Sequence, residues 1–567
     1  MGEPRVETAA EALLVRLAQR GVEFVLANAG TDFAPLIEGL CRLRSVGTAV
    51  PEMLAIAHES VAVAMAHGYW LVTGRPQAVM LHTNVGLANA VMGLINAAAD
   101  EVPMLALSGR TPVTETGRVG SRDLPIHWGQ EMRDQAAMVR ELTKWDYELR
   151  FPEQVADLVD RALAIAASPP GGPVYLSLPR EVLCAPRSEL LDPTPRQVPA
   201  ASSRPDPAAI AEAAEWLARA ERPLVVAQRS GRDAAGMAAL VRLAEAAALP
   251  VVEHWPVRIS FPADHPLHAG FDPHPLVREA DLIIAVDAPV PWLPGRAAPP
   301  PDCRVVTLGA DPLHARIPVR FWPADLVLAG DPTATLEALA DAVSERLGDE
   351  QERLARRRAG IGTLNAAWRA AAAEQAERGS GTPMSPAWVG RCLARAIGED
   401  GVVFAELGVD PAQLGRTRPG SWFNHALSGG LGWALPAALG AQLADRDRLV
   451  VATVGDGSYL FANPVACHQV AAANRLPVLT IVLDNGMWNA VRKSTLAVYP
   501  EGQAARANRM PLTALEPRPD HAAVCSACGG WGRRVREGEA LPDALAQALR
   551  VVREERRQAL LQVEVTP

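Results

Sequence analysis

The chain has 567 residues, of which 49% are hydrophobic and 21% charged, with a formal net charge of −9. This length suggests about three domains, and the apolar share allows each of them a large core. The acidic balance argues against sequence-independent nucleic-acid binding, because that needs a basic surface. The first residues lack the pattern of a secretory signal, and no apolar run is long enough for a membrane span, so we expect a cytoplasmic protein.

Helix-like and strand-like segments alternate through the first 184 residues. Short apolar runs that are typical of buried strands lie at 22–28, 77–82, 102–108 and 173–178. Alternation of this kind predicts a parallel sheet with helices on both of its faces. We therefore predict an N-terminal α/β domain over residues 1–184.

Two further domains are predicted after it. The proline-rich segment 185–207 breaks the pattern and is interpreted as a linker, and 346–380 is interpreted as a helical, charged connector. The central domain is predicted over 208–345, with strands at 223–227, 281–286 and 304–308, and the third over 381–567, with strands at 449–454, 478–483 and 560–565. The predicted fold class is α/β, with three doubly wound parallel-sheet domains.

Polar residues follow two neighbouring strands of the third domain. Gly455-Asp456-Gly457-Ser458 comes directly after one strand, and Asp484-Asn485-Gly486-Met487 comes directly after the next. One strand–helix–strand unit separates Asp456 from Asn485, so both are expected at carboxyl ends of parallel strands, where α/β sheets bind ligands. Mg²⁺ prefers oxygen ligands such as the Asp456 carboxylate and the Asn485 amide oxygen. Gly455, Gly457 and Ser458 would let backbone N–H groups approach a diphosphate at a helix start. A bare Gly-Asp-Gly also occurs in ordinary tight turns.

These segments resemble the metal–diphosphate motif of the thiamine-diphosphate enzymes, the family of acetolactate synthase, pyruvate decarboxylase and benzoylformate decarboxylase. Residues 428–442 are similar to the segment that precedes this motif in the family, and the resemblance covers nearly the whole chain. It implies thiamine diphosphate and Mg²⁺ as cofactors, with the backbone carbonyl of Met487 as a third metal ligand. The chain departs from the family in a slightly longer Asp-to-Asn interval, with the extra residues around 460–464, and in Asp484 where the family often has Asn.

The resemblance also implies catalytic residues in the N-terminal domain. Residues 58–69 are similar to the family's His-Glu…Ala-x-Gly-Tyr segment, so Glu59 would protonate the aminopyrimidine ring of the cofactor. Leu81-His82-Thr83 resembles the Leu-His-Ser of benzoylformate decarboxylase, whose histidine transfers protons. The alternatives are a Glu that the helix dipole favours at a helix start, and a structural His at a strand end.

Other residues are assigned to the cofactor and the substrate pocket by the same resemblance. Leu431 would wedge between the two cofactor rings, unless it is an ordinary core leucine, and the carbonyl of Gly429 would accept a hydrogen bond from the aminopyrimidine. Asn28, Gln130 and Trp488 are expected to line the pocket, and Gln130-Glu131 resembles the Gln-Glu of acetolactate synthases.

The central domain leaves its cofactor open. Some family members bind FAD there, some bind ADP and many bind nothing. Arg229-Ser230-Gly231-Arg232 follows the first central strand and could face a phosphate, but it lacks a full dinucleotide fingerprint, which favours an empty domain. Trp292 stands where benzoylformate decarboxylase has a second active-site histidine, which puts a simple assignment to that enzyme in doubt.

The resemblance implies an enzyme that makes or breaks carbon–carbon bonds of a 2-oxo acid or a 2-hydroxy ketone. Acetolactate-synthase-like carboligation with decarboxylation is the preferred hypothesis, and a non-oxidative 2-oxo acid decarboxylase or a 2-hydroxyacyl lyase is the alternative. A catalytically silent binding or assembly subunit would be expected to lose Glu59, Asp456 or Asn485, and all three are present. In the family the active site lies between subunits, which implies a homodimer or homotetramer.

Overall fold

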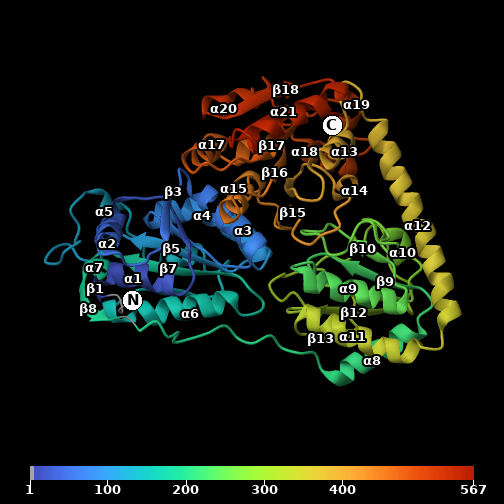
Figure 1. Ribbon diagram of the computed structural model, residues 1–567, viewed down its shortest axis with the longest axis horizontal. Coiled ribbons are helices and arrows are strands. Elements are labelled where there is room, and N and C mark those ends of the chain that lie inside the picture. The colour runs from blue at the N-terminus through green and yellow to red at the C-terminus, as the bar shows by residue number, and fades with distance from the viewer. Residues whose placement is uncertain (1–4, 191) are drawn as a thin grey trace.

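Three parallel sheets organise the chain in the computed structural model, which describes residues 5–190 and 192–567 (Figure 1). Each sheet belongs to one section of the chain, and helices cover both of its faces. Strand order departs from chain order in every sheet, as doubly wound sheets require. The predicted fold class is therefore confirmed.

The N-terminal sheet has the order β3-β2-β4-β5-β7-β6. Its strands are β2 (Phe24–Ala27), β3 (Glu52–Ala55), β4 (Ala78–Leu81), β5 (Met104–Arg110), β6 (Asp146–Glu148) and β7 (Pro173–Pro179). The helices are α1 (Ala9–Gln19), α2 (Ala34–Ser45), α3 (Glu59–Thr73), α4 (Thr83–Ala99), α5 (Ile126–Gly129), α6 (Val155–Ala167) and α7 (Arg180–Cys184), with short 3₁₀ turns η1 (Thr31–Phe33), η2 (Ala136–Met138) and η3 (Pro152–Gln154). Strands β4, β5 and β7 are buried at every position, which is typical of a parallel sheet that helices cover on both faces.

A small antiparallel pair lies at the edge of this domain. Strand β1 (Arg5–Thr8) pairs with β8 (Pro186–Leu190). The first residues of the segment interpreted as a linker therefore form a strand with the start of the chain. The exact limits of the three domains stay a prediction.

The central sheet has the order β10-β9-β11-β12-β13. Its strands are β9 (Pro223–Ala227), β10 (Val251–Glu253), β11 (Leu282–Val286), β12 (Arg304–Gly309) and β13 (Leu326–Ala329), with helices α8 (Pro207–Arg219), α9 (Ala234–Ala247), α10 (His274–Val277) and α11 (Pro332–Leu347). Aspartates start three of these helices, because the carboxylates of Asp206, Asp233 and Asp331 accept backbone N–H bonds at the N-caps. The 27-residue helix α12 (Gln351–Glu377) then runs along one side of the molecule to the third domain (Figure 1).

The third sheet has the order β15-β14-β16-β17-β19-β18. Its strands are β14 (Val402–Glu406), β15 (Trp422–Asn424), β16 (Val450–Gly455), β17 (Leu479–Asp484), β18 (Trp531–Val535) and β19 (Ala559–Glu564). The helices are α13 (Pro386–Ile397), α14 (Pro411–Leu414), α15 (Ala434–Ala444), α16 (Asp456–Phe461), α17 (Pro464–Ala473), α18 (Asn489–Val498), α19 (Gln503–Ala507), α20 (His521–Ala527) and α21 (Leu541–Arg553), with the 3₁₀ turn η4 (Gly538–Ala540).

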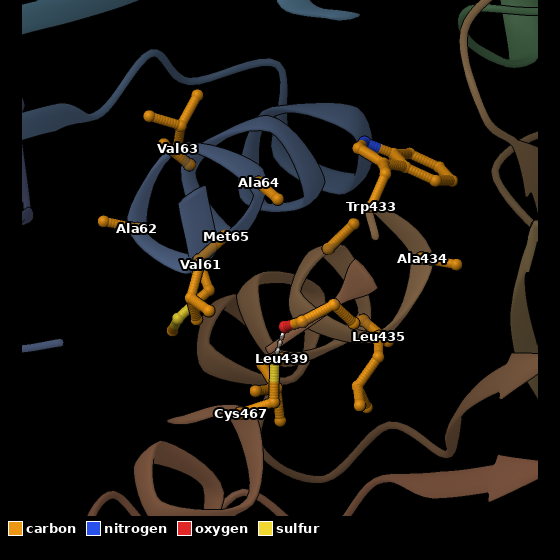
Figure 2. Close-up of a cluster of buried hydrophobic side chains, with 14 of the residues drawn as sticks. Val61, Ala62, Val63, Ala64, Met65, Trp433, Ala434, Leu435, Leu439 and Cys467 are labelled. Carbon is orange, nitrogen blue, oxygen red and sulfur yellow. Dashed lines mark hydrogen bonds between the residues drawn. The ribbon is translucent and has the colours of Figure 1, made fainter. Parts of the chain in front are cut away.

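The N-terminal and third domains meet where α3 crosses α15. A Cβ atom on Gly68 would lie 1.9 Å from the carbonyl oxygen of Ala437, and one on Gly440 would lie 1.9 Å from that of Met65. The two helices therefore touch backbone to backbone, and only glycine fits at either position. Figure 2 shows the buried cluster around the crossing, in which Met65 of α3 and Leu439 of α15 take part.

None of the helices in the described parts of the chain has both the length and the apolar character that crossing a membrane requires.

Candidate active site

Asp456 stands where β16 ends and α16 begins. Strand β17 runs parallel to β16, so the loop that follows β17 lies beside this carboxylate. The N–H of Gly486 donates to Asp456 Oδ2 at 2.8 Å, and the N–H of Gly457 donates to Oδ1 at 3.0 Å. Asp456 is only 3% exposed, and this burial, with the neighbouring Asp484, raises the pKa of Asp456 to about 6. The two strand ends that the sequence singles out are thus brought together.

The loop after β17 offers neutral oxygen atoms next to Asp456. Asn485 is partly exposed, and its Oδ1 accepts the N–H of Met487 at 3.0 Å. The carbonyl of Met487 accepts the N–H of Asn489 at 2.9 Å and keeps a second lone pair. Asp484 also lies beside Asp456, but it is buried and both of its carboxylate oxygens already accept hydrogen bonds, Oδ1 from the N–H of Gly486 at 3.0 Å and Oδ2 from Gln562 at 2.8 Å. This arrangement favours Asn485 over Asp484 as the residue that faces a bound cation.

Trp488 covers the glycine of the predicted diphosphate segment. A Cβ atom on Gly457 would lie 2.3 Å from the indole ring, so the ring rests directly on this glycine. The ring also packs at 5.6 Å against Phe461. Gly455 caps the start of α16, and Ser458 is buried within its first turn. Trp488 therefore lies beside the segment that would hold a phosphate group.

The loop before α15 carries Gly429 and Leu431. Gly429 has φ +68°, a conformation that glycine adopts readily, and no atom lies within 4 Å of where its Cβ would be. Leu431 is partly buried and lies outside the main core clusters of the described residues. The loop thus presents both residues without filling the space around Gly429.

Glu59 lies at the first position of α3, in the N-terminal domain. Its carboxylate is 8% exposed and accepts a hydrogen bond from Asn89 of α4, with 3.1 Å between Nδ2 and Oε2. Gly86 of the same helix leaves room for it, since a Cβ there would lie 3.1 Å from Oε1 of Glu59. Glu59 is therefore a nearly dry carboxylate that α4 holds in place.

His82 forms a pair with a carboxylate that sequence reasoning missed. Its Nδ1 lies 2.6 Å from Oδ1 of the buried Asp32, and its Nε2 lies 3.3 Å from the side-chain nitrogen of Gln130. A carboxylate only accepts, so Nδ1 carries the proton of this bond. The hydrogen bond to Asp32 raises the pKa of His82, and the charge of Glu59 acts in the same direction. His82 is thus held as a proton donor or acceptor through Nε2.

Three protein-domain families, all from one group of enzymes, match this chain. They are the thiamine pyrophosphate enzyme N-terminal TPP binding domain over residues 7–138, the central domain over 210–339 and the C-terminal TPP binding domain over 407–563. The chain belongs to the thiamine pyrophosphate enzyme family. Thiamine pyrophosphate is thiamine diphosphate, so the predicted family and its organic cofactor are confirmed, and the chain is an enzyme of this family.

Curated relatives and solved structures agree with this membership. A probable 2-ketoarginine decarboxylase of Pseudomonas aeruginosa is 29% identical over 559 residues, which cover 96% of this chain and 91% of the relative. A benzoylformate decarboxylase of the same species is 29% identical, covering 84% and 85% of the two chains. The acetolactate synthase isozyme 3 large subunit of Escherichia coli is 25% identical, covering 98% and 94%. Among solved structures, a thiamine diphosphate-dependent 4-hydroxybenzoylformate decarboxylase of Rhodococcus jostii superposes with a TM-score of 0.77 at 25% identity, covering 99% of each chain.

The side chain of Asn28 in this thiamine pyrophosphate enzyme hydrogen-bonds to the backbone of a neighbouring loop. Its Nδ2 donates to the carbonyl of Ile56 at 2.9 Å, which ties the loop after β2 to the loop after β3. The same loop brings Gly30 against His82, where a Cβ would lie 2.0 Å from Nδ1. Asn28 therefore shapes the wall beside His82 through the loop that it fixes.

Asp32 left only an indirect signal in the sequence. Its carboxylate packs directly on Gly109, where a Cβ would lie 1.5 Å from Oδ2, so only glycine leaves room for it. The N–H of Thr83 also donates to Oδ2 at 3.3 Å. Glycines at strand ends mark close approaches, but they do not say which side chain approaches.

Glu406 is a second missed residue of this thiamine pyrophosphate enzyme. It ends β14, is fully buried and accepts the backbone N–H groups of Gly432, Trp433 and Ala434 at 2.6, 2.6 and 2.8 Å. Burial raises the pKa of Glu406 to about 7. This carboxyl fixes the end of the Gly429–Leu431 loop where it enters α15.

Arg229 of the central domain is already neutralised. Its guanidinium, which is buried, lies 2.8 Å from a carboxylate oxygen of Asp287 and 3.0 Å from one of Glu101. A cavity of about 250 Å³ adjoins this group, with Trp70 and Arg232 among its lining residues. Trp292, by contrast, is buried in the core of the central domain.

Proposed function

We propose that this chain decarboxylates a 2-oxo acid without oxidation, with thiamine diphosphate and Mg²⁺ as cofactors. The observation that carries the proposal is the His82–Asp32 pair. Loss of CO₂ from a 2-oxo acid leaves an electron pair on the former carbonyl carbon, and that carbon needs a proton to become an aldehyde. A histidine held at Nδ1 by a buried carboxylate, with a raised pKa, is suited to give this proton from Nε2.

The residues of the third domain fit the metal–diphosphate part of the cofactor. No cluster of three or more His, Cys, Asp or Glu side chains in the described chain has the geometry of a metal site, so a cation at Asp456 would also need amide and carbonyl oxygens. Asn485 and the carbonyl of Met487 offer them on the adjacent loop, and this all-oxygen set suits Mg²⁺. Gly455, Gly457 and Ser458 would hold the diphosphate.

The remaining residues would orient the cofactor and protonate its aminopyrimidine ring. When bound, thiamine diphosphate supplies the nucleophilic carbon and takes up the electron pair that is released as CO₂ leaves. Glu59 would share a proton with the aminopyrimidine ring, a role that suits a carboxylate with little water around it. Gly429 and Leu431 would receive the pyrimidine side of the cofactor, and Trp488 would exclude water beside the phosphate segment.

Carboligation of the acetolactate synthase type is the second candidate. Gln130 favours it, because this residue resembles the family's Gln-Glu pair and lies 3.3 Å from Nε2 of His82. Its Oε1 is buried and accepts no hydrogen bond from any described residue. This amide could bind the carbonyl group of an acceptor substrate. The carbon of that carbonyl would then compete with the proton of His82 for the former carbonyl carbon of the 2-oxo acid.

We propose that two copies complete the active site, as a homodimer or as half of a homotetramer. Glu59 and His82 belong to the N-terminal domain, whereas Asp456 and Asn485 belong to the third. Apolar side chains with exposed fractions of about one third to two thirds support a second copy against both domains, namely Val85 and Ile95 on α4 and Phe461 and Val465 near α16 and α17.

FAD is not part of this proposal, because the central domain does not fit it. Arg229 is paired with two carboxylates and is not free for a phosphate, and residues 229–232 lack a full dinucleotide fingerprint. The cytoplasmic location expected from the sequence stays a prediction.

A turnover screen of 2-oxo acids tests the function. Purified protein with thiamine diphosphate and Mg²⁺ is given aliphatic, aromatic and guanidino 2-oxo acids, and CO₂ release and product mass are measured. An aldehyde product supports decarboxylation, and a 2-hydroxy ketone or acetohydroxy acid supports carboligation. Glu59→Gln keeps the size of the side chain and removes its acidity, so unchanged turnover in this variant would refute the proposed mechanism.

A further inference from the structure

Asn96 joins the N-terminal domain to the loop that precedes α15. It lies on α4 and has no exposed surface. Its Nδ2 donates to the carbonyl of Gly430 at 2.8 Å, while its Oδ1 accepts the N–H of Gly430 at 3.2 Å and the hydroxyl of Ser428 at 2.8 Å. One side-chain amide thus pairs with both backbone groups of one residue in another domain.

This contact leaves no spare room. A Cβ atom on Gly430 would lie 2.5 Å from Oδ1 of Asn96, so a side chain there would push the amide away. The two bonds hold the peptide groups on either side of the Gly430 Cα, so together they fix the position and the orientation of the backbone there. Gly430 is therefore held in one register against α4.

The loop is held on both sides of the residues assigned to the cofactor. Asn96 holds Ser428 and Gly430, and Glu406 holds the three backbone N–H groups that start at Gly432. Gly429 lies between the two residues that Asn96 holds and has open space around its Cβ position, and Leu431 lies between Gly430 and the residues that Glu406 holds. The loop thus has fixed ends and one free face at Gly429.

We propose that Asn96 is a positioning residue for the aminopyrimidine side of the cofactor. The inference rests on the proposed function, in which the Gly429 carbonyl and Leu431 receive that ring. Asn96 would not contact the cofactor itself. It fixes the position of the loop whose Gly429 carbonyl and Leu431 would contact the aminopyrimidine ring. The cofactor loop of the third domain is therefore set by the N-terminal domain of the same chain.

The variants form a graded series. Asn96→Ala removes all three bonds and leaves both backbone groups of Gly430 without a protein partner, so thiamine diphosphate should bind about 10-fold or more weakly. Ser428→Ala removes one bond from the exposed side of the loop and should weaken binding about two- to five-fold. Ser428→Ala also keeps the inference testable if Asn96→Ala does not fold.

Asn365 provides a matched control on α12. It is also buried, and its Nδ2 donates to two backbone carbonyls, those of His268 at 2.8 Å and His265 at 3.2 Å. Asn365→Ala should lower the melting temperature as Asn96→Ala does, but it should leave the affinity for thiamine diphosphate within about two-fold of the wild type.

Two measurements test the inference. The Kd of thiamine diphosphate at fixed Mg²⁺ is taken from tryptophan fluorescence, since Trp433 and Trp488 flank the loop and the phosphate segment. Hydrogen exchange of residues 428–432 is followed without cofactor, where loss of the Asn96 acceptor should speed exchange at Gly430.

Weaker binding and faster exchange in Asn96→Ala, with neither change in Asn365→Ala, is the expected result. Wild-type affinity and exchange in Asn96→Ala, or equal weakening in Asn365→Ala, would overturn the inference. A wild-type chain that binds no thiamine diphosphate would overturn the proposed function and the cofactor role of Asn96 with it; the exchange measurement, made without cofactor, separates that failure from a loop that Asn96 does not hold.

Discussion

A methyl group at Gly68 tests the contact between α3 and α15. The Cβ of Gly68→Ala would lie 1.9 Å from the carbonyl oxygen of Ala437, so the helices must separate by more than about 1 Å to restore an ordinary contact. Overpacking of this kind costs about 1–3 kcal/mol, and a clash with backbone belongs at the upper end of that range. Replacing a helical Gly by Ala returns about 1 kcal/mol. We expect a net loss of about 2 kcal/mol in the free energy of unfolding.

Urea unfolding of the full-length chain measures this loss, with Gly360→Ala on α12 as the control. Gly360 lies within α12 with no atom within 4 Å of its Cβ position, so Ala there should raise stability by about 0.5–1 kcal/mol. Since α3 begins at Glu59, Gly68→Ala should also reduce turnover, whereas Gly360→Ala should not. A urea midpoint for Gly68→Ala at or above that of the wild type would show that the helices do not meet backbone to backbone.

Three further predictions concern the charged groups. Asp32→Asn removes the carboxylate that raises the pKa of His82, so the protonated imidazole is lost at lower pH and the alkaline limb of the kcat/KM profile should move to lower pH; an unmoved limb would exclude the pair from catalysis. Asp456→Ala removes the one carboxylate of the predicted Mg²⁺ set and should weaken cofactor binding roughly 100-fold or more by calorimetry, and wild-type heats would contradict the metal assignment. Arg229→Met removes the guanidinium that pairs with Asp287 and Glu101 and leaves them the longer-range charge of Arg232, so it should cost about 3 kcal/mol in thermal or urea unfolding; an unchanged midpoint would contradict these buried ion pairs.

The metal–diphosphate region could be predicted because its geometry is local. Asp456 and Asn485 each follow an apolar run, and runs joined by one helix form adjacent parallel strands, so their ends meet. The same reasoning located four strands of the first sheet and three of each of the other two, but it missed β14, although every residue of that strand is buried. Strand β3, which has only one buried residue, and the three-residue β15 gave no such periodicity and were not predicted.

The partners of the predicted residues could not be read from the sequence. Asp32 and His82 are 50 positions apart, and their contact depends on loop conformations after β2 and β4. Asn96 and Gly430 are 334 positions apart and meet only because two domains pack together. Glu406 binds backbone N–H groups, which leave no residue-type signal at all. Side-chain direction at a domain boundary depends on tertiary packing, and no periodicity encodes it.

Helix α4 connects residues that are assigned to two different parts of the cofactor site. Its first turns follow His82 and place Asn89 on Glu59, and Asn96 near its other end grips the Gly430 peptide. At 1.5 Å per residue, Asn96 lies about 20 Å along the helix axis from His82. If each site is shared between two copies, one end of the helix belongs to the first site and the other end to the second. The orientation of this one helix would then position a catalytic histidine in one site and the cofactor loop in the next.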